Sequence, residues 1–141
     1  MFGFTKLASF IAVLSVLGSA SVSAAPVEGE LHQLEPRLTH YGRGTWFNVG
    51  LGHCGGWSTD DELVVAIPTS LYNRNGGSNC GQKVSITNTK NGKNVIATVA
   101  DSCPPCDGDS LDLSPAAFNA IAEGGLDEGV MQIKWNFQKR D

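Results

Sequence analysis

The sequence predicts a small, mainly β domain, folded as a barrel or a sandwich. Short stretches of alternating apolar and polar residues recur between residues 83 and 137, as in half-buried strands. Seventeen glycines and six prolines in 141 residues predict many turns. A single short helix is clearly indicated, so we do not expect a helical bundle.

Five or six short strands account for most of the expected regular structure. The clearest strand segments are residues 44–47, 62–67, 83–87, 94–100 and 130–137. The pair Asn91-Gly92 predicts a hairpin between the third and fourth of these segments. Ser114-Pro115 predicts the start of a helix that runs to about Ala122, because a serine hydroxyl caps and proline suits the first turn. Residues 70–72 are expected to form one helical turn.

The N-terminal segment is typical of a secretory signal peptide. Lys6 precedes an apolar run from Leu7 to Leu17, and Val22-Ser23-Ala24 supplies small residues before a cleavage site. The run is too short to span a bilayer. We therefore expect a secreted, extracellular protein. The expected organisation is a signal peptide at 1–24, a disordered leader at 25–38, a domain at 39–137 and a tail at 138–141.

The charge balance argues against nucleic acid and membranes as partners. The formal charge is −4 from 10 basic and 14 acidic residues. Loss of residues 1–24 removes one lysine and no acid, which leaves 9 against 14, or −5. Polyanionic partners select basic proteins. No nucleotide or flavin motif is present, so we expect no cofactor and no bound metal. We expect a monomer.

Four cysteines follow the signal segment, at positions 54, 80, 103 and 106. An even count in a small secreted chain predicts two disulfides, with three possible connectivities. Two alternatives remain open at this stage. Cys103 and Cys106 have the spacing of a redox pair, although no strand–helix–strand pattern surrounds them. Four sulfurs also suit zinc, although Cys54 and Cys80 lack the spacing of half a zinc site.

Carboxylates crowd around the second cysteine pair. Asp101, Asp107, Asp109 and Asp112 fall within twelve positions. Asp112 lies between two leucines just before the helix cap, where partial burial raises a carboxyl pKa and suits a general acid. Solvation in a loop is the alternative for all four acids. Asp107 and Asp109 alone offer too few oxygen ligands for calcium.

Exposed aromatic side chains stack on sugar rings, and three residues are candidates for this role. Trp46, Trp57 and Tyr72 are the candidate substrate-binding residues, with core packing as the alternative. Trp135 is expected in the core. His40 and His53 stand isolated in the sequence, so a serine–histidine–aspartate arrangement has no support.

Four ordered blocks resemble the expansin-like double-psi β-barrel family, within the RlpA-like and barwin-like superfamily. The blocks are Gly44–Gly55, Asn79–Val84, Val99–Phe118 and Gly129–Phe137. Single-domain fungal loosenins and riboflavin-aldehyde-forming enzyme-like proteins have the most similar pattern. The resemblance implies a six-stranded double-psi β-barrel with one or two short helices and a polysaccharide groove. It also implies the disulfides Cys54–Cys80 and Cys103–Cys106.

The resemblance implies site residues one by one. Asp112 matches the essential acid of the family, Asp101 the second groove acid, and Thr45 the groove threonine of the opening strand. Bacterial members have a tyrosine two residues after the first acid, where this chain has Cys103. We expect no counterpart of the carbohydrate-binding second domain of expansins.

The expected function is non-hydrolytic loosening of cell-wall polysaccharide, cellulose or chitin. Inverting hydrolysis needs an acid and a base. Related endoglucanases carry a base near the opening strand, where this chain has Thr45 and Asn48 and no acid. We therefore do not expect a hydrolase. The first alternative is a protein-binding module, such as an inhibitor of a secreted protease or an effector. The second is a lytic or oxidative enzyme.

Overall fold

The computed structural model describes residues 37–141, so the expected signal peptide and nearly all of the expected leader lie outside the described residues. Regular structure begins at His40 and ends at Phe137. The elements are β1 (His40–Trp46), β2 (Val64–Pro68), α2 (Thr69–Arg74), β3 (Lys83–Asn88), β4 (Asn94–Cys103), β5 (Leu111–Leu113), α3 (Pro115–Ile121), the 3-10 helix η1 (Gly125–Glu128) and β6 (Met131–Phe137).

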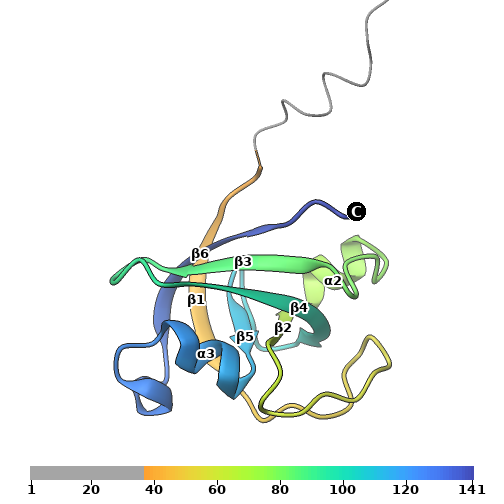
Figure 1. Cartoon of the computed structure of the whole chain (residues 1–141). Coiled ribbons are helices and arrows are strands. Elements are labelled where there is room, and N and C mark those ends of the chain that lie inside the picture. Colours follow the sequence, from red (N-terminus) through yellow and green to blue (C-terminus); the bar gives the residue numbers. More distant parts are fainter. Residues whose placement is uncertain (1–36) are drawn as a thin grey trace, which may run out of the picture. The chain divides into compact units, whose positions relative to one another are not determined.

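The six strands form a closed barrel in the order β1-β5-β2-β4-β3-β6 (Figure 1). The predicted six-stranded barrel is therefore confirmed, and the sandwich alternative is wrong. The pairs β1/β5 and β2/β4 are parallel, while the other four pairs are antiparallel. The predicted hairpin joins β3 to β4, and Gly92 takes the positive φ of 74° that its turn requires.

Branched side chains from alternate strand positions fill the barrel. Leu111 and Leu113 of β5 are fully buried, as are Ile86 of β3 and Phe118 of α3. Trp135 of β6 is 1% exposed, which confirms its expected core position. Because side chains alternate along a strand, the residue between the two leucines faces out of the barrel.

The helices are short, and α3 begins where the sequence predicts. Ser114 accepts a hydrogen bond through its hydroxyl from the Ala117 N–H at 3.2 Å, and proline follows it at the first helical position. The predicted single turn at residues 70–72 is part of α2. No helix within residues 37–141 has the length and apolar character to cross a membrane.

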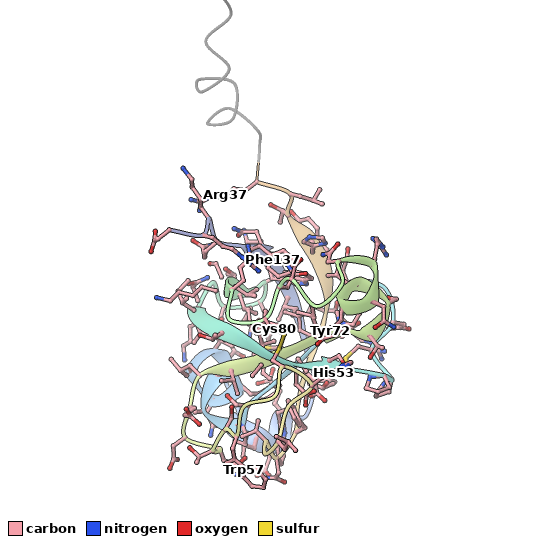
Figure 2. All side chains as sticks on the ribbon, turned by 90° about the vertical axis from the view of Figure 1, so that its right-hand side faces the viewer. Arg37, His53, Trp57, Tyr72, Cys80 and Phe137 are labelled. Carbon is pink, nitrogen blue, oxygen red and sulfur yellow. A yellow bond between two sulfur atoms is a disulfide. The ribbon has the colours of Figure 1, made fainter. Side chains whose placement is uncertain are left out.

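A long glycine-rich loop connects β1 to β2. Leu51 and Trp57 pair across it in an isolated β-bridge, and both side chains are largely exposed. Figure 2 shows Trp57 at the end of the domain opposite Arg37, and His53 on the same loop beside Tyr72. A disulfide joins Cys54 of this loop to Cys80.

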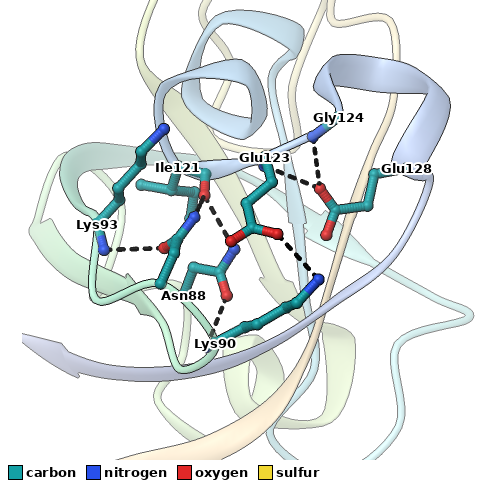
Figure 3. A network of polar contacts seen from close by, with 8 residues as sticks. Asn88, Lys90, Lys93, Ile121, Glu123, Gly124 and Glu128 are labelled. Carbon is teal, nitrogen blue, oxygen red and sulfur yellow. Dashed lines mark hydrogen bonds and ion pairs between the residues drawn. The ribbon is translucent and has the colours of Figure 1, made fainter.

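The turn between β3 and β4 is fastened to the end of α3 by asparagine side chains (Figure 3). Asn88 is fully buried, donates to the Ile121 carbonyl oxygen at 2.9 Å and accepts from the Lys90 N–H at 2.9 Å. Asn91 donates to the same carbonyl oxygen at 2.9 Å. An ion pair between Lys90 and Glu123 at 2.9 Å lies at the surface of this network.

Asn88→Ala is expected to lower the free energy of unfolding by about 1–3 kcal/mol, because the Ile121 carbonyl oxygen loses a donor, the Lys90 N–H loses its acceptor and a cavity forms. Asn91→Ala, at a less buried site, should cost about 0.5–1.5 kcal/mol. Urea unfolding of the two variants checks this ranking. An equal loss in both would mean that burial of Asn88 contributes nothing.

Candidate functional site

Asp112 is the centre of the candidate site, and the barrel topology puts it opposite Thr45. The parallel pairing of β1 and β5 sets these two residues in register. The Thr45 hydroxyl donates to Asp112 Oδ1 at 2.9 Å. Leu111 and Leu113 anchor β5 in the core on either side, so the half-buried carboxylate is held rigidly. Two of the three predicted site residues therefore make direct contact.

A hollow of about 210 Å³ opens over this pair. We refer to it as the Asp112 hollow; its lining residues are Arg43, Thr45, Cys103, Pro105, Cys106, Ser110 and Asp112. Arg43 was not predicted, although strand alternation puts it on the same face of β1 as Thr45. Among the lining residues, Asp112 is the only carboxylate and Arg43 the only cation.

The loop between β4 and β5 forms one wall of the Asp112 hollow. The disulfide Cys103–Cys106 closes its first turn, so both disulfides have the connectivity that the family resemblance implies. Arg43 pairs with Asp107 at 3.3 Å. A hydrogen bond from Ser110, followed by the contact with Arg43, lowers the pKa of Asp107. Asp107 thus stabilises this wall of the Asp112 hollow through its contacts with Arg43 and Ser110.

The far end of the same loop is fixed to β1 and β6. The His40 ring stacks on Trp135 with centroids 4.0 Å apart, and its Nδ1 lies 3.0 Å from Asp109 Oδ1. The Trp135 indole donates to the Asp109 carbonyl oxygen at 2.7 Å. Gly42 is required here, because a Cβ at that position would overlap the Asp109 backbone. No three acidic, histidine or cysteine side chains gather to hold a metal within residues 37–141.

Asp101 lies two strands away from Asp112. Ala66 of β2 pairs with Asp112 on one side and with Asp101 on the other. At about 4.8 Å per strand, the two Cα atoms are roughly 10 Å apart. Asp101 Oδ1 accepts from the backbone N–H groups of His53 and Ser102, both at 2.8 Å. The third predicted residue therefore belongs to the same outer face but does not line the Asp112 hollow.

Burial is the largest influence on Asp112 and raises the pKa of its carboxyl group. The hydrogen bond from Thr45 acts in the opposite direction, while the charge of Asp101 raises the pKa further. The side chain is therefore protonated at a higher pH than an ordinary aspartate. A carboxyl group of this kind can donate a hydrogen bond while it is protonated and accept one in either state.

The raised pKa predicts a pH-dependent gain in stability for Asp112→Asn. A folded-state pKa above the unfolded value means that the ionised carboxylate destabilises the fold, and that this cost vanishes below the ordinary pKa of 3.8. The variant should unfold at higher urea than wild type at pH 7, and the difference should disappear near pH 3. A stability gain of equal size at both pH values would contradict a raised pKa for Asp112 in the folded state.

The three predicted aromatic residues lie in different surroundings. Trp46 packs against the core and donates from its indole nitrogen to the Leu126 carbonyl oxygen at 2.9 Å. Trp57 is 75% exposed in the long loop. Tyr72 stacks on His53, with ring centroids 4.2 Å apart. None of the three lines the Asp112 hollow.

The two histidines stand isolated in the sequence, but in the folded domain each contacts a polar side chain. His40 contacts Asp109, as described above. His53 Nδ1 lies 2.9 Å from the Ser102 hydroxyl, across 49 positions of sequence. No periodicity or motif links residues so far apart, and the contact exists because the long loop folds back over β4.

The neighbourhood of Asn48 also contains an acid that the sequence did not reveal. Asp60 accepts from the Asn48 side chain at 2.8 Å and from the Val49 N–H at 2.9 Å, one bond to each carboxylate oxygen. Asp60 is thus engaged in shaping the loop, and it does not line the Asp112 hollow.

Comparisons with known proteins agree with this architecture. A family model described as lytic transglycolase (DPBB_1) matches residues 39–135. The papain inhibitor of Streptomyces mobaraensis is 30% identical over 134 residues, which covers 89% of this chain and 88% of the inhibitor. Kiwellin from Actinidia chinensis var. chinensis is 37% identical over 95 residues, 57% of this chain. The chain spans only 42% of kiwellin and 39% of ripening-related protein grip22 from Vitis vinifera.

Two solved structures share the fold. An expansin from Clavibacter michiganensis in complex with cellohexaose superimposes with a TM-score of 0.63 at 28% identity, over 74% of this chain and 52% of the expansin. The Streptomyces papain inhibitor gives a TM-score of 0.63 at 33% identity, over 74% of this chain and 98% of the inhibitor. The chain therefore belongs to the RlpA-like double-psi β-barrel family whose model is described as lytic transglycolase.

Proposed function

We propose that this is a secreted protein that binds cell-wall polysaccharide, cellulose or chitin, at the Asp112 hollow and loosens its packing without hydrolysing it. The observation that carries the proposal is the Thr45–Asp112 hydrogen bond at 2.9 Å beside this hollow. A half-buried carboxyl group with a raised pKa offers strong hydrogen bonds to sugar hydroxyls. The expansin related in fold was solved with cellohexaose, which supports a glucan as ligand.

The carboxylate arrangement argues against hydrolysis. An inverting glycosidase holds a second carboxylate about 6.5–9.5 Å from its acid to activate water. Asp101 is the acid on the same outer face, but two backbone N–H groups occupy its Oδ1. Asp60 has both oxygens engaged elsewhere. We infer that Asp112 acts alone, as a hydrogen-bonding group.

Secretion accords with the two disulfides, which form in oxidising compartments.

Sedimentation with insoluble polysaccharide tests binding directly. The protein is expected to co-sediment with cellulose or chitin, and Asp112→Asn and Thr45→Val should each reduce the bound fraction. Asp127→Asn is the matched control, because Asp127 is an exposed acid on η1. Equal binding by all four proteins would contradict a role for the Asp112 hollow.

Inhibition of a secreted cysteine protease is the second candidate function. The observation that favours it is the match to the papain inhibitor, which extends over most of both chains. Leu51 is 69% exposed and Trp57 75% exposed, and together they offer an apolar contact surface in the long loop. A papain assay tests this function. Inhibition that is lost in Trp57→Ala and kept in Asp112→Asn would assign the loop to a protease, whereas no inhibition would exclude this candidate.

A further inference from the structure

His53 is fixed at the Asp101 end of the outer barrel face by its backbone. Its N–H donates to Asp101 Oδ1 at 2.8 Å. The preceding residue, Gly52, lies so close to β4 that a Cβ there would overlap the Ala100 carbonyl oxygen. The following residue, Cys54, donates its N–H to the same oxygen at 3.2 Å and is bonded to Cys80. The backbone of His53 is therefore held on both sides.

The imidazole ring of His53 is also held. It stacks on Tyr72 with centroids 4.2 Å apart and an interplanar angle of 17°, and its Nδ1 lies 2.9 Å from the Ser102 hydroxyl. The Tyr72 hydroxyl donates to the His53 carbonyl oxygen at 3.4 Å. Figure 2 shows the two labelled side chains together beside Cys80. His53 is nevertheless exposed, and its Nε2 makes no hydrogen bond to any residue within 37–141.

We propose that the His53–Tyr72 pair is a second sugar-binding subsite, which extends the Asp112 hollow toward Asp101. A stacked, pre-ordered aromatic pair presents a flat surface to the C–H face of a sugar ring at low entropic cost. His53 Nε2 would form a hydrogen bond with a sugar hydroxyl. The ligand is a neutral, β-linked chain long enough to reach from Asp112 past Asp101. This inference rests on the proposed polysaccharide function and adds a dependence on chain length.

Oligosaccharides of two lengths test the subsite. Calorimetric affinities of the secreted protein would be measured for cellotriose and cellohexaose, and for chitotriose and chitohexaose. Wild type should bind the matching hexasaccharide more tightly than the trisaccharide. His53→Ala and Tyr72→Ala should each weaken hexasaccharide binding roughly fivefold and leave trisaccharide binding unchanged. Tyr72→Phe, which keeps the ring, is the matched control and should still bind the hexasaccharide more tightly than the trisaccharide.

The other outcomes separate the subsite from the function on which it rests. Asp112→Asn should weaken binding of both lengths. The His53 imidazole proton signals should shift with hexasaccharide and not with trisaccharide, which gives a readout independent of the variants. A length-dependent gain that survives in His53→Ala and Tyr72→Ala would overturn the subsite and leave the proposed function standing. No binding of any oligosaccharide by wild type would overturn both.

Discussion

Replacing Asp112 with asparagine is expected to abolish most of the weakening of cellulose or chitin networks. The amide keeps the size of the side chain and its contact with Thr45, but it removes the charge. Hydrogen bonds to a charged group are worth about 1.5–3 kcal/mol, so about tenfold to a hundredfold more protein should be needed for the same effect. The measurement is the tensile strength of a polysaccharide sheet after incubation with increasing protein.

Asp127→Asn provides the control for charge alone, since this residue is exposed on η1 and does not line the Asp112 hollow. It should weaken the sheet as wild type does. Far-ultraviolet circular dichroism and the urea midpoint would establish that Asp112→Asn is folded. A folded Asp112→Asn protein with full activity would contradict the central role of this carboxyl group.

Removing the disulfide between Cys54 and Cys80 is expected to produce the largest loss of stability. Its sequence separation of 26 closes a long loop, and the chain-entropy relation gives about 3.5 kcal/mol for that closure. Cys54→Ser combined with Cys80→Ser should lower the free energy of unfolding by that amount. Urea unfolding at neutral pH measures it.

The second disulfide gives a contrasting expectation. Cys103 and Cys106 are three positions apart, so the same relation gives only about 2 kcal/mol. The Cys103→Ser, Cys106→Ser protein should therefore lose less stability but should lose polysaccharide binding, because both residues line the Asp112 hollow. The reverse ranking of the two stability losses would show that loop closure is not the main contribution.

Local sequence patterns predicted the elements whose signals are local. The alternation of residues 83–87 and 94–100 is reproduced by β3 and β4, which pair as the predicted hairpin. The serine cap and proline fixed the start of α3. Strand β5 was not assigned, because three residues are too few to show a period of two. Its identity as a strand depends on parallel pairing with β1, more than 60 positions earlier.

In the candidate site, too, some features could be predicted from the sequence and others depend on long-range packing. The family resemblance implied Asp112, Asp101 and Thr45 as site residues, and the barrel brings Thr45 and Asp112 into contact. The contacts of His53 with Ser102 and of Asn48 with Asp60 depend on how a glycine-rich loop folds. Glycine gives such a loop many accessible conformations, and packing against β4 selects one of them. No pattern in the sequence predicts which conformation the loop adopts.

The protein is expected to weaken polysaccharide packing without cutting the chains, and one paired measurement tests this expectation. Sheet strength and total soluble carbohydrate would be measured in the same incubation, the latter by mass spectrometry, since lytic cleavage need not create a reducing end. We predict that strength falls while soluble carbohydrate stays at the level of a protein-free control. Release of oligosaccharides by wild type that is abolished in Asp112→Asn would contradict the account and assign a glycan-cleaving activity to the Asp112 hollow.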